Sequence, residues 1–142
     1  MHKMLLPFDG SESALRALNY AVRLAKGNGS VSVHLVHAHE EPLTYGELAV
    51  YVSREQMAEL QRAHSEDVLA TAEALLKQAG VSYTKEVLTG PVAESIAKRA
   101  EETGCDRIVM GTRGLSAVEN LLIGSVATKV VHLATVPVTL VK

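Results

Sequence analysis

The stretch GTRGLSAVENLLIGS, residues 111–125, carries glycines at a spacing that can bind an anion. Gly111 and Gly114 come directly after the apolar run RIVM, and without a Cβ atom their backbone N–H groups can approach a charged ligand closely. Gly124 and Ser125 begin a helical pattern after a nine-residue insert, where unpaired N–H groups, the helix dipole and the Ser125 hydroxyl favour phosphate. The segment therefore predicts two anion-binding elements that act on one ligand.

Asp9 is another residue whose type suggests ligand chemistry. It ends the apolar run KMLLPF, and its carboxylate can accept hydrogen bonds from the ribose hydroxyls of a nucleotide. Taken singly, each of these residues has a simpler explanation, since glycine is common in turns and aspartate is favoured near the start of a helix. Only their combination favours a nucleotide site.

Short apolar runs bounded by turn residues predict the strands that position this site. Five runs have the length and the β-branched content of buried or half-buried strands. They cover residues 3–8, 31–38, 81–88, 106–110 and 136–141. Asp9 follows the first run and Gly111 follows the fourth, so both lie at the carboxyl end of a predicted strand.

Apolar residues at helical spacing predict helices between these strands, over residues 11–27, 53–80, 91–104 and 125–134. Ser53 opens a capping box, and Pro91 fits the first position of its helix. Residues 39–52 show no clear period and are expected to form a connection. The longest helix carries an apolar stripe made of Met57, Leu60, Val68, Ala72, Leu75 and Ala79.

This alternation predicts one domain, residues 1–142, of the α/β class: a single open five-stranded parallel sheet with helices on both faces, Rossmann-like. Ligands of such sheets bind beyond the carboxyl ends of the strands, where the winding reverses. The pattern alone does not fix the strand order. In the order 3-2-1-4-5 the first and fourth strands are neighbours, and Asp9 and Gly111 face each other across that crevice.

The composition excludes several classes of partner. A net charge of −2 and a pI near 6.3 give no basic surface for nucleic acid or for an anionic membrane. No apolar run approaches the ~20 residues that a membrane span needs. The single cysteine, Cys105, cannot form an internal disulfide and is expected to be a small buried side chain in a reducing compartment. We therefore expect a cytoplasmic protein.

The spacing Gly111-x2-Gly114-x9-Gly124-Ser125 resembles the nucleotide-binding signature of the universal stress protein family, in its ATP-binding branch. The resemblance extends over the whole chain. LLPFDGS is similar to the family's first strand and turn, VHLVHAHE to its second strand, and GCDRIVMGTRG to its fourth. The family fold, an open five-stranded α/β sheet, agrees with the order of elements predicted above.

This resemblance implies an ATP site made from three parts of the chain. The part around adenine and ribose is expected to contain Pro7, Phe8, Asp9 and Ala38. The ribose-phosphate side is expected to contain Met110, Gly111, Thr112, Arg113 and Gly114. The phosphates are expected at Gly124, Ser125, Val126 and Ala127.

Ala127 departs from the pattern, because some ATP-binding relatives carry a hydroxyl residue at this position. A neutral hydroxyl contact contributes about 1 kcal/mol net, so we expect weaker phosphate contact rather than lost binding. Any Mg²⁺ is expected to be held by the phosphates and by water. Arg113 could pair with a phosphate or remain solvated.

Other site chemistry has less support in the sequence. No P-loop motif G-x4-G-K-[ST] occurs. His37 and His39 share one face of a predicted strand while His34 points the other way, but this pair lacks a clear third and fourth metal ligand. We interpret these residues as histidines that bind no metal.

Hydrolysis of ATP needs a positioned water and a group that orients it, and the sequence nominates no such group strongly. Glu119 could approach the phosphates, but a carboxylate there would repel them in the absence of a cation. We therefore expect an ATP-binding regulatory protein of the stress response with at most slow turnover. Nucleotide occupancy would order the 111–125 loop and alter a surface that an unknown downstream protein recognises.

Two other functions are weighed against this one. A protein-interaction module with an empty pocket would need the same glycines only as turn and cap residues. A phosphoacceptor signalling domain is disfavoured, because it needs an acidic cluster at the end of a central strand, whereas residues 88–90 and 110–111 read LTG and MG.

The run VPVTLV near the end of the chain predicts a strand at a sheet edge, and an unpaired edge strand can pair with another strand. In the resembled family this strand commonly pairs with its copy across a two-fold axis. A homodimer is therefore expected.

Overall fold

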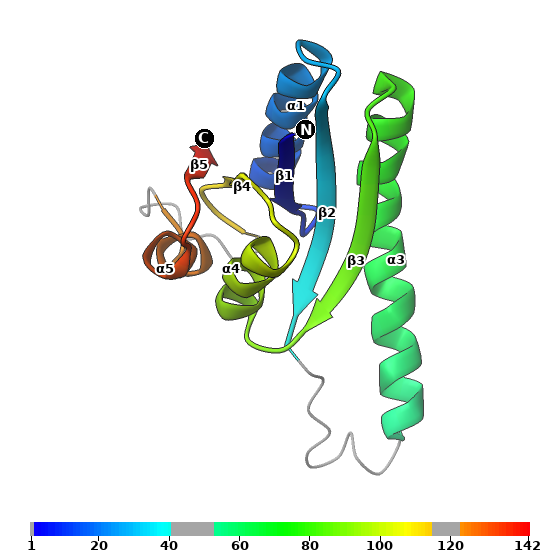
Figure 1. The fold of residues 1–142 in the computed structure, drawn as a ribbon. Coiled ribbons are helices and arrows are strands. Elements are labelled where there is room, and N and C mark those ends of the chain that lie inside the picture. The colour runs from blue at the N-terminus through cyan, green and yellow to red at the C-terminus, as the bar shows by residue number, and fades with distance from the viewer. Residues whose placement is uncertain (1, 41–52, 115–122) are drawn as a thin grey trace.

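Five parallel strands form one open sheet (Figure 1). The computed structural model describes residues 2–40, 53–114 and 123–142, and all the predicted strands lie within these ranges. The strand order is β3-β2-β1-β4-β5 with every neighbouring pair parallel, which confirms the order 3-2-1-4-5. The strands are β1 (His2–Pro7), β2 (Val31–His39), β3 (Tyr83–Thr89), β4 (Arg107–Gly111) and β5 (Val138–Val141).

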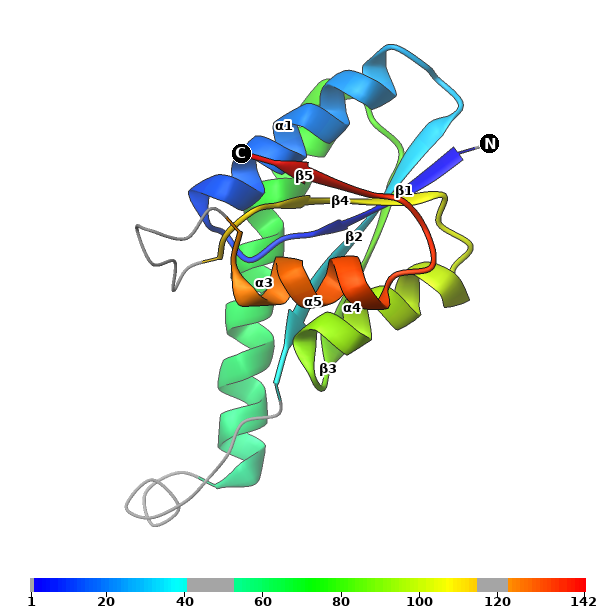
Figure 2. The same ribbon diagram turned by 90° about the vertical axis from the view of Figure 1, so that its left-hand side faces the viewer.

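The helices of the described residues cover both faces of this sheet, as Figure 2 shows. One face is covered by α1 (Glu12–Lys26) and α3 (Arg54–Ala79). The opposite face is covered by α4 (Val92–Glu102) and α5 (Ser125–Leu133). The predicted α/β architecture is therefore confirmed.

Residues of β1 alternate between two hydrophobic cores. Met4 and Leu6 pack in the core beneath α1 and α3, whereas Leu5 packs in the core beneath α4 and α5. These three side chains are at most 2% exposed. A parallel strand that is buried on both faces is apolar throughout, which is why the run KMLLPF predicts a central strand.

The end of α3 shortens the third predicted strand. Gly80 adopts a left-handed φ of 72°, and the N–H of Val81 donates to the carbonyl oxygen of Leu76 at 3.0 Å. This is the Schellman arrangement of a helix end, in which the residue after glycine packs back against the helix. Val81 is accordingly buried, and β3 begins at Tyr83 instead of residue 81.

The boundaries of α4 also differ from the prediction. Pro91 is the residue before the helix, with an extended ψ of 124°, and is not its first residue. Its missing N–H is no loss at either position, so the sequence pattern does not separate them. At the other end the cap is Thr103, one residue before the predicted stop at Gly104.

The predicted apolar stripe of α3 is wrong in its first half. Leu60 is 62% exposed, and the buried residues of the helix are Ser65, Leu69, Ala72 and Leu76. Figure 1 shows the reason, because the first turns of α3 extend beyond the end of the sheet and have no strand beneath them. The predicted capping box at Ser53 is confirmed, with Ser53 Oγ accepting from the N–H of Gln56 at 3.1 Å.

This difference in burial predicts different costs for two substitutions in the same helix. Leu76→Ala removes a side chain that is 0% exposed and should lower the free energy of unfolding by about 2–5 kcal/mol. Leu60→Ala should change it by less than about 0.5 kcal/mol. Urea denaturation followed by circular dichroism measures both. Equal losses in the two variants would contradict this account of α3 packing.

Candidate functional site

The site arises where β1 and β4 separate. The two strands pair only through Met4 with Arg107 and Leu5 with Ile108. Beyond these pairs, β1 continues beside β2 as far as Pro7, and β4 continues beside β5 as far as Gly111. A gap therefore opens between the carboxyl ends of two neighbouring strands, at the place where the direction of winding reverses.

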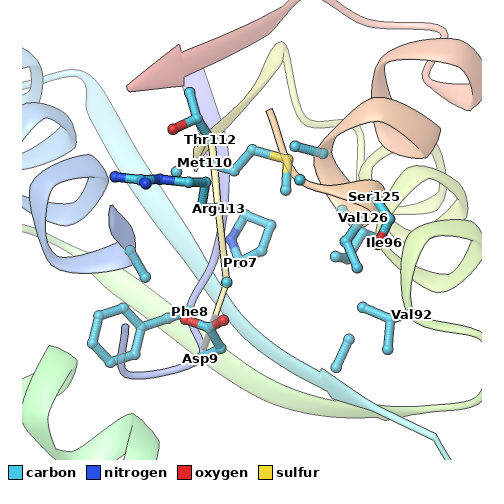
Figure 3. Close-up of a pocket in the computed structure, with 16 residues that line it drawn as sticks. Pro7, Phe8, Asp9, Val92, Ile96, Met110, Thr112, Arg113, Ser125 and Val126 are labelled. Atoms are coloured by element: carbon cyan, nitrogen blue, oxygen red, sulfur yellow. The ribbon is translucent and has the colours of Figure 1, made fainter. Parts of the chain in front are cut away.

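A cavity of about 440 Å³ occupies this gap (Figure 3). Every residue that the sequence nominated for the ligand site lines it. Residues of the β1 and β2 ends contribute Pro7, Phe8, Asp9 and Ala38, and the β4 end contributes Met110, Gly111, Thr112, Arg113 and Gly114. The start of α5 contributes Gly124, Ser125, Val126 and Ala127.

The cavity is also lined by three residues that the sequence did not nominate: Ala14 of α1 and Val92 and Ile96 of α4. They sit at apolar helix positions, which a sequence pattern assigns to the core. The order of elements could have predicted Val92 and Ile96. Because α4 starts directly after β3 ends, its first turns must lie at the carboxyl edge of the sheet.

Two nominated side chains point away from the places that the sequence predicted for them. The Phe8 side chain is 2% exposed and belongs to the core beneath α1 and α3, so its ring is turned away from the cavity. Figure 3 shows the Arg113 side chain extending toward α1 and away from Ser125. The guanidinium group is therefore not beside the α5 start, where the sequence placed the phosphates.

Gly111 is required by packing more than by ligand access. A Cβ atom at this position would lie 2.2 Å from Ser13 Oγ and 2.7 Å from the Ser13 carbonyl carbon. Ser13 is a buried residue of α1, so its backbone cannot move away without shifting the helix. The glycine thus lets α1 and β4 come together, which differs from the role in anion binding that the spacing suggested.

Several amide groups of the glycine segment are already hydrogen-bonded. The N–H of Thr112 donates to the Val141 carbonyl at 3.2 Å, and the N–H of Arg113 donates to Ser13 Oγ at 3.3 Å. The N–H of Gly124 donates to the Thr112 carbonyl at 2.6 Å. The Gly124 bond holds the start of α5 against the end of β4, and the other two join the segment to β5 and α1. All three amides are therefore unavailable to a ligand.

Within the part of the chain that the structure describes, the first N–H groups of α5 have no hydrogen-bond partner. Helix geometry leaves the first N–H groups without an intrahelical partner, and the cap residue Gly124 provides no side-chain acceptor. The N–H groups of Ser125, Val126 and Ala127, with the Ser125 hydroxyl, therefore give this end of the cavity a set of donors that suits an anion. No acidic residue occupies this first turn.

Asp9 lies at the other side of the cavity with one carboxylate oxygen engaged. Its Oδ1 accepts the N–H of Ser11 at 2.9 Å, which stabilises the turn from β1 into α1. Its Oδ2 faces Gly114, where a Cβ atom would approach it to 3.0 Å. Oδ2 is thus the acceptor that can meet a ligand hydroxyl.

The predicted faces of the β2 histidines are confirmed. His34 Nδ1 and Nε2 contact Thr84 Oγ1 at 2.6 Å and Glu86 Oε1 at 2.7 Å on the α4 side. His37 points the other way, and its Nδ1 donates to the Phe8 carbonyl at 2.9 Å. Burial lowers the pKa of His37, against the opposing effect of this hydrogen bond.

Across residues 2–40, 53–114 and 123–142, no set of three or more His, Cys, Asp or Glu side chains is already arranged to hold a metal ion. The expectation that Cys105 is a small buried side chain is confirmed, and burial raises the pKa of its thiol. No helix in these ranges has the length and apolar character of a membrane span. Glu119, which the sequence placed near the phosphates, lies outside the described residues.

An open parallel α/β sheet with a helix start and a carboxylate facing a cavity at its switch point defines a doubly wound α/β protein with a small-molecule cavity. Comparison with known proteins then gives the family. The universal stress protein family matches residues 1–142, so this chain belongs to that family.

Individual relatives agree with this assignment. The chain is 40% identical over 141 residues to a universal stress protein of Thermus aquaticus, with 98% of this chain and 97% of the relative covered. It is 32% identical to the universal stress protein YxiE of Bacillus subtilis, with 99% of each chain covered. The universal stress protein of Archaeoglobus fulgidus in complex with dAMP matches with a TM-score of 0.69 and 25% identity, over 100% of this chain and 98% of that one.

The contact between Gly111 and Ser13 predicts a loss of stability that does not depend on any ligand. Gly111→Ala should lower the free energy of unfolding by about 1–3 kcal/mol, because the added methyl group overpacks the α1 and β4 contact. Gly29→Ala is the matched control, since nothing lies within 4 Å of a Cβ atom there. Thermal unfolding without nucleotide measures both, and an unchanged melting temperature for Gly111→Ala would contradict the packing role.

Proposed function

We propose that this member of the universal stress protein family is a cytoplasmic regulatory protein that binds an adenine nucleotide, ATP being the ligand that its glycine spacing favours. The observation that carries the proposal is the polarity of the cavity between β1 and β4. Its volume of about 440 Å³ lies within the range of small-molecule sites, roughly 300–1,000 Å³. Its lining combines apolar side chains with backbone donors that suit an anion.

The apolar part of the lining suits a purine base. Ala38, Val92 and Ile96 form it, and they belong to the core beneath α4 and α5. The Asp9 carboxylate lines the cavity beside Gly114, where it can accept from a ribose hydroxyl. The free N–H groups at the start of α5 then meet the phosphates. Base, sugar and phosphate each have a chemically matched partner.

The dAMP complex of the Archaeoglobus fulgidus relative supports an adenine nucleotide over other ligands of this shape. That relative has the same fold along the whole of this chain. Support for the triphosphate comes from the glycine spacing, which resembles the ATP-binding branch. Mg²⁺ fits such a ligand, because Arg113 is turned away from the α5 start and the phosphate charge needs a further cation.

We propose that the protein acts by binding the nucleotide and not by hydrolysing it. Among the described residues that line the cavity, Asp9 is the only carboxylate, and it lies across the cavity from the α5 start. No described lining group is thus placed to orient a water at the phosphates. A bound nucleotide would join the β1–α1 turn to the start of α5, and a downstream protein would recognise the surface so ordered.

Substitution of Ser125 separates phosphate binding from helix stability. Ser125→Asp places a negative charge at the start of α5, where it repels phosphate but interacts favourably with the helix dipole. We expect affinity for ATP and AMP to fall at least about tenfold, which corresponds to about 1.4 kcal/mol, while the melting temperature stays equal or rises. Isothermal titration calorimetry and thermal unfolding give the two readouts.

Ser125→Asn is the matched control, because asparagine is neutral and of similar size to aspartate. It should change nucleotide affinity by no more than about threefold. Absence of saturable binding to the unmodified chain at millimolar ATP and AMP would overturn the proposal and favour the interaction module with an empty pocket. Mass spectrometry of the purified protein would identify any nucleotide that it retains.

We also propose a homodimer formed through β5. This strand lies at one edge of the sheet, and its residues are all half-buried. The helix that precedes it carries three exposed apolar side chains: Val126 at 37%, which lines the cavity, and Val131 at 49% and Leu133 at 47% exposure. An unpaired edge strand beside exposed apolar surface favours pairing with a second copy.

Charge placed beside this edge should weaken the dimer. Val131→Glu is expected to shift the mass measured by light scattering at tens of micromolar from dimer toward monomer. Leu60→Glu is the matched control, because Leu60 is also exposed but lies on α3, which packs on the opposite face of the sheet. A monomeric unmodified chain at this concentration would refute the dimer.

A further inference from the structure

Three imidazole rings gather at the carboxyl end of β2, on the face that α3 covers. The ring centroid of His37 lies 6.0 Å from that of His39 and 6.0 Å from that of His64. His37 and His39 are two residues apart on the strand and therefore share a face. His64 comes from α3, so the third ring reaches this cluster only through the packing of that helix against β2.

Backbone carbonyl groups fix the position of the proton on two of these rings. His37 Nδ1 lies 2.9 Å from the Phe8 carbonyl oxygen, and His39 Nδ1 lies 2.8 Å from the Glu40 carbonyl oxygen. A carbonyl oxygen can only accept, so each Nδ1 carries the hydrogen and each neutral ring presents its lone pair at Nε2. Metal-ligating histidines are oriented in this way by an N–H donated to a carbonyl group.

We propose that His37, His39 and His64 form a binding site for a divalent transition-metal ion, with Zn²⁺ as its representative, outside the nucleotide cavity. Three imidazole nitrogens and one water complete the tetrahedral set that Zn²⁺ prefers. Neutral imidazole suits Zn²⁺, Cu²⁺ and Ni²⁺, whereas Mg²⁺ and Ca²⁺ prefer oxygen ligands. The site is therefore chemically distinct from any Mg²⁺ that the nucleotide phosphates hold.

The three side chains do not surround a common point as they stand. His37 is 6% exposed and is held by its bond to Phe8, so it is the fixed member of the site. His64 is exposed and His39 is half-exposed, and such side chains change rotamer at small cost. Metal binding is thus expected to draw His64 and His39 toward the Nε2 atom of His37.

The surrounding charge favours a cation at this position. Besides the two neighbouring histidines, the charged group that acts on His37 is the carboxylate of Asp9. A carboxylate beside the fixed histidine therefore favours a cation at this position.

Titration of the full chain with Zn²⁺ tests the site, using protein that carries no histidine tag and has been treated with a chelator. Calorimetry at neutral pH should show one ion per chain with an affinity in the micromolar range. His39→Gln and His64→Gln should each weaken binding at least tenfold. His132→Gln is the matched control, because His132 is an exposed histidine on α5, and it should leave the affinity unchanged.

A second measurement separates metal ligation from a general effect on folding. Co²⁺ in place of Zn²⁺ should give the visible absorption of a tetrahedral complex, and His64→Gln should abolish it while keeping the melting temperature of the metal-free protein. The proposal is overturned if Zn²⁺ shows no saturable binding at hundreds of micromolar. It is equally overturned if His64→Gln binds as the unmodified chain does, or if His132→Gln loses the same affinity.

Discussion

The limited pairing of β1 with β4 is the constraint on which the rest of this structure depends. Only two residue pairs join these strands, and each strand then follows its other neighbour. Stronger pairing would close the gap between their carboxyl ends, where Pro7 and Met110 now face a cavity. The ligand site is therefore a consequence of where the central ladder stops, and the sheet remains joined by the pairs at its amino end.

The glycine segment stabilises this arrangement in two different ways. Gly111 allows α1 to approach β4, because its missing Cβ atom leaves room for Ser13. The amides of Thr112 and Arg113 then donate to β5 and α1, and the amide of Gly124 attaches the start of α5 to the end of β4. The donors that remain for an anion belong to the first turn of α5. Packing and ligand binding thus use separate atoms of one short motif.

The same edge of the sheet carries two kinds of polar chemistry, separated by the backbone of Phe8 and Asp9. On one side, the Asp9 carboxylate faces the cavity between β1 and β4. On the other, His37 donates to the Phe8 carbonyl and lies beside two further histidines. The turn after β1 therefore contacts both regions, through the Phe8 carbonyl on one side and the Asp9 carboxylate on the other. A ligand bound on either side would restrict the motion of this same turn.

The sequence by itself determined the alternation of strands and helices and the class of sheet, because apolar periodicity is a local property. Asp9 and the glycine spacing indicated the cavity, and the resemblance to the universal stress protein family supplied the other nominated lining residues. Tertiary structure alone decided which part of α3 is buried, since Leu60 lies beyond the end of the sheet while Leu76 lies beneath it. It also decided that Val92 and Ile96 reach the cavity and that His64 meets His37. These contacts join segments distant in the chain, and their geometry depends on how helices pack across strands, which no local pattern records.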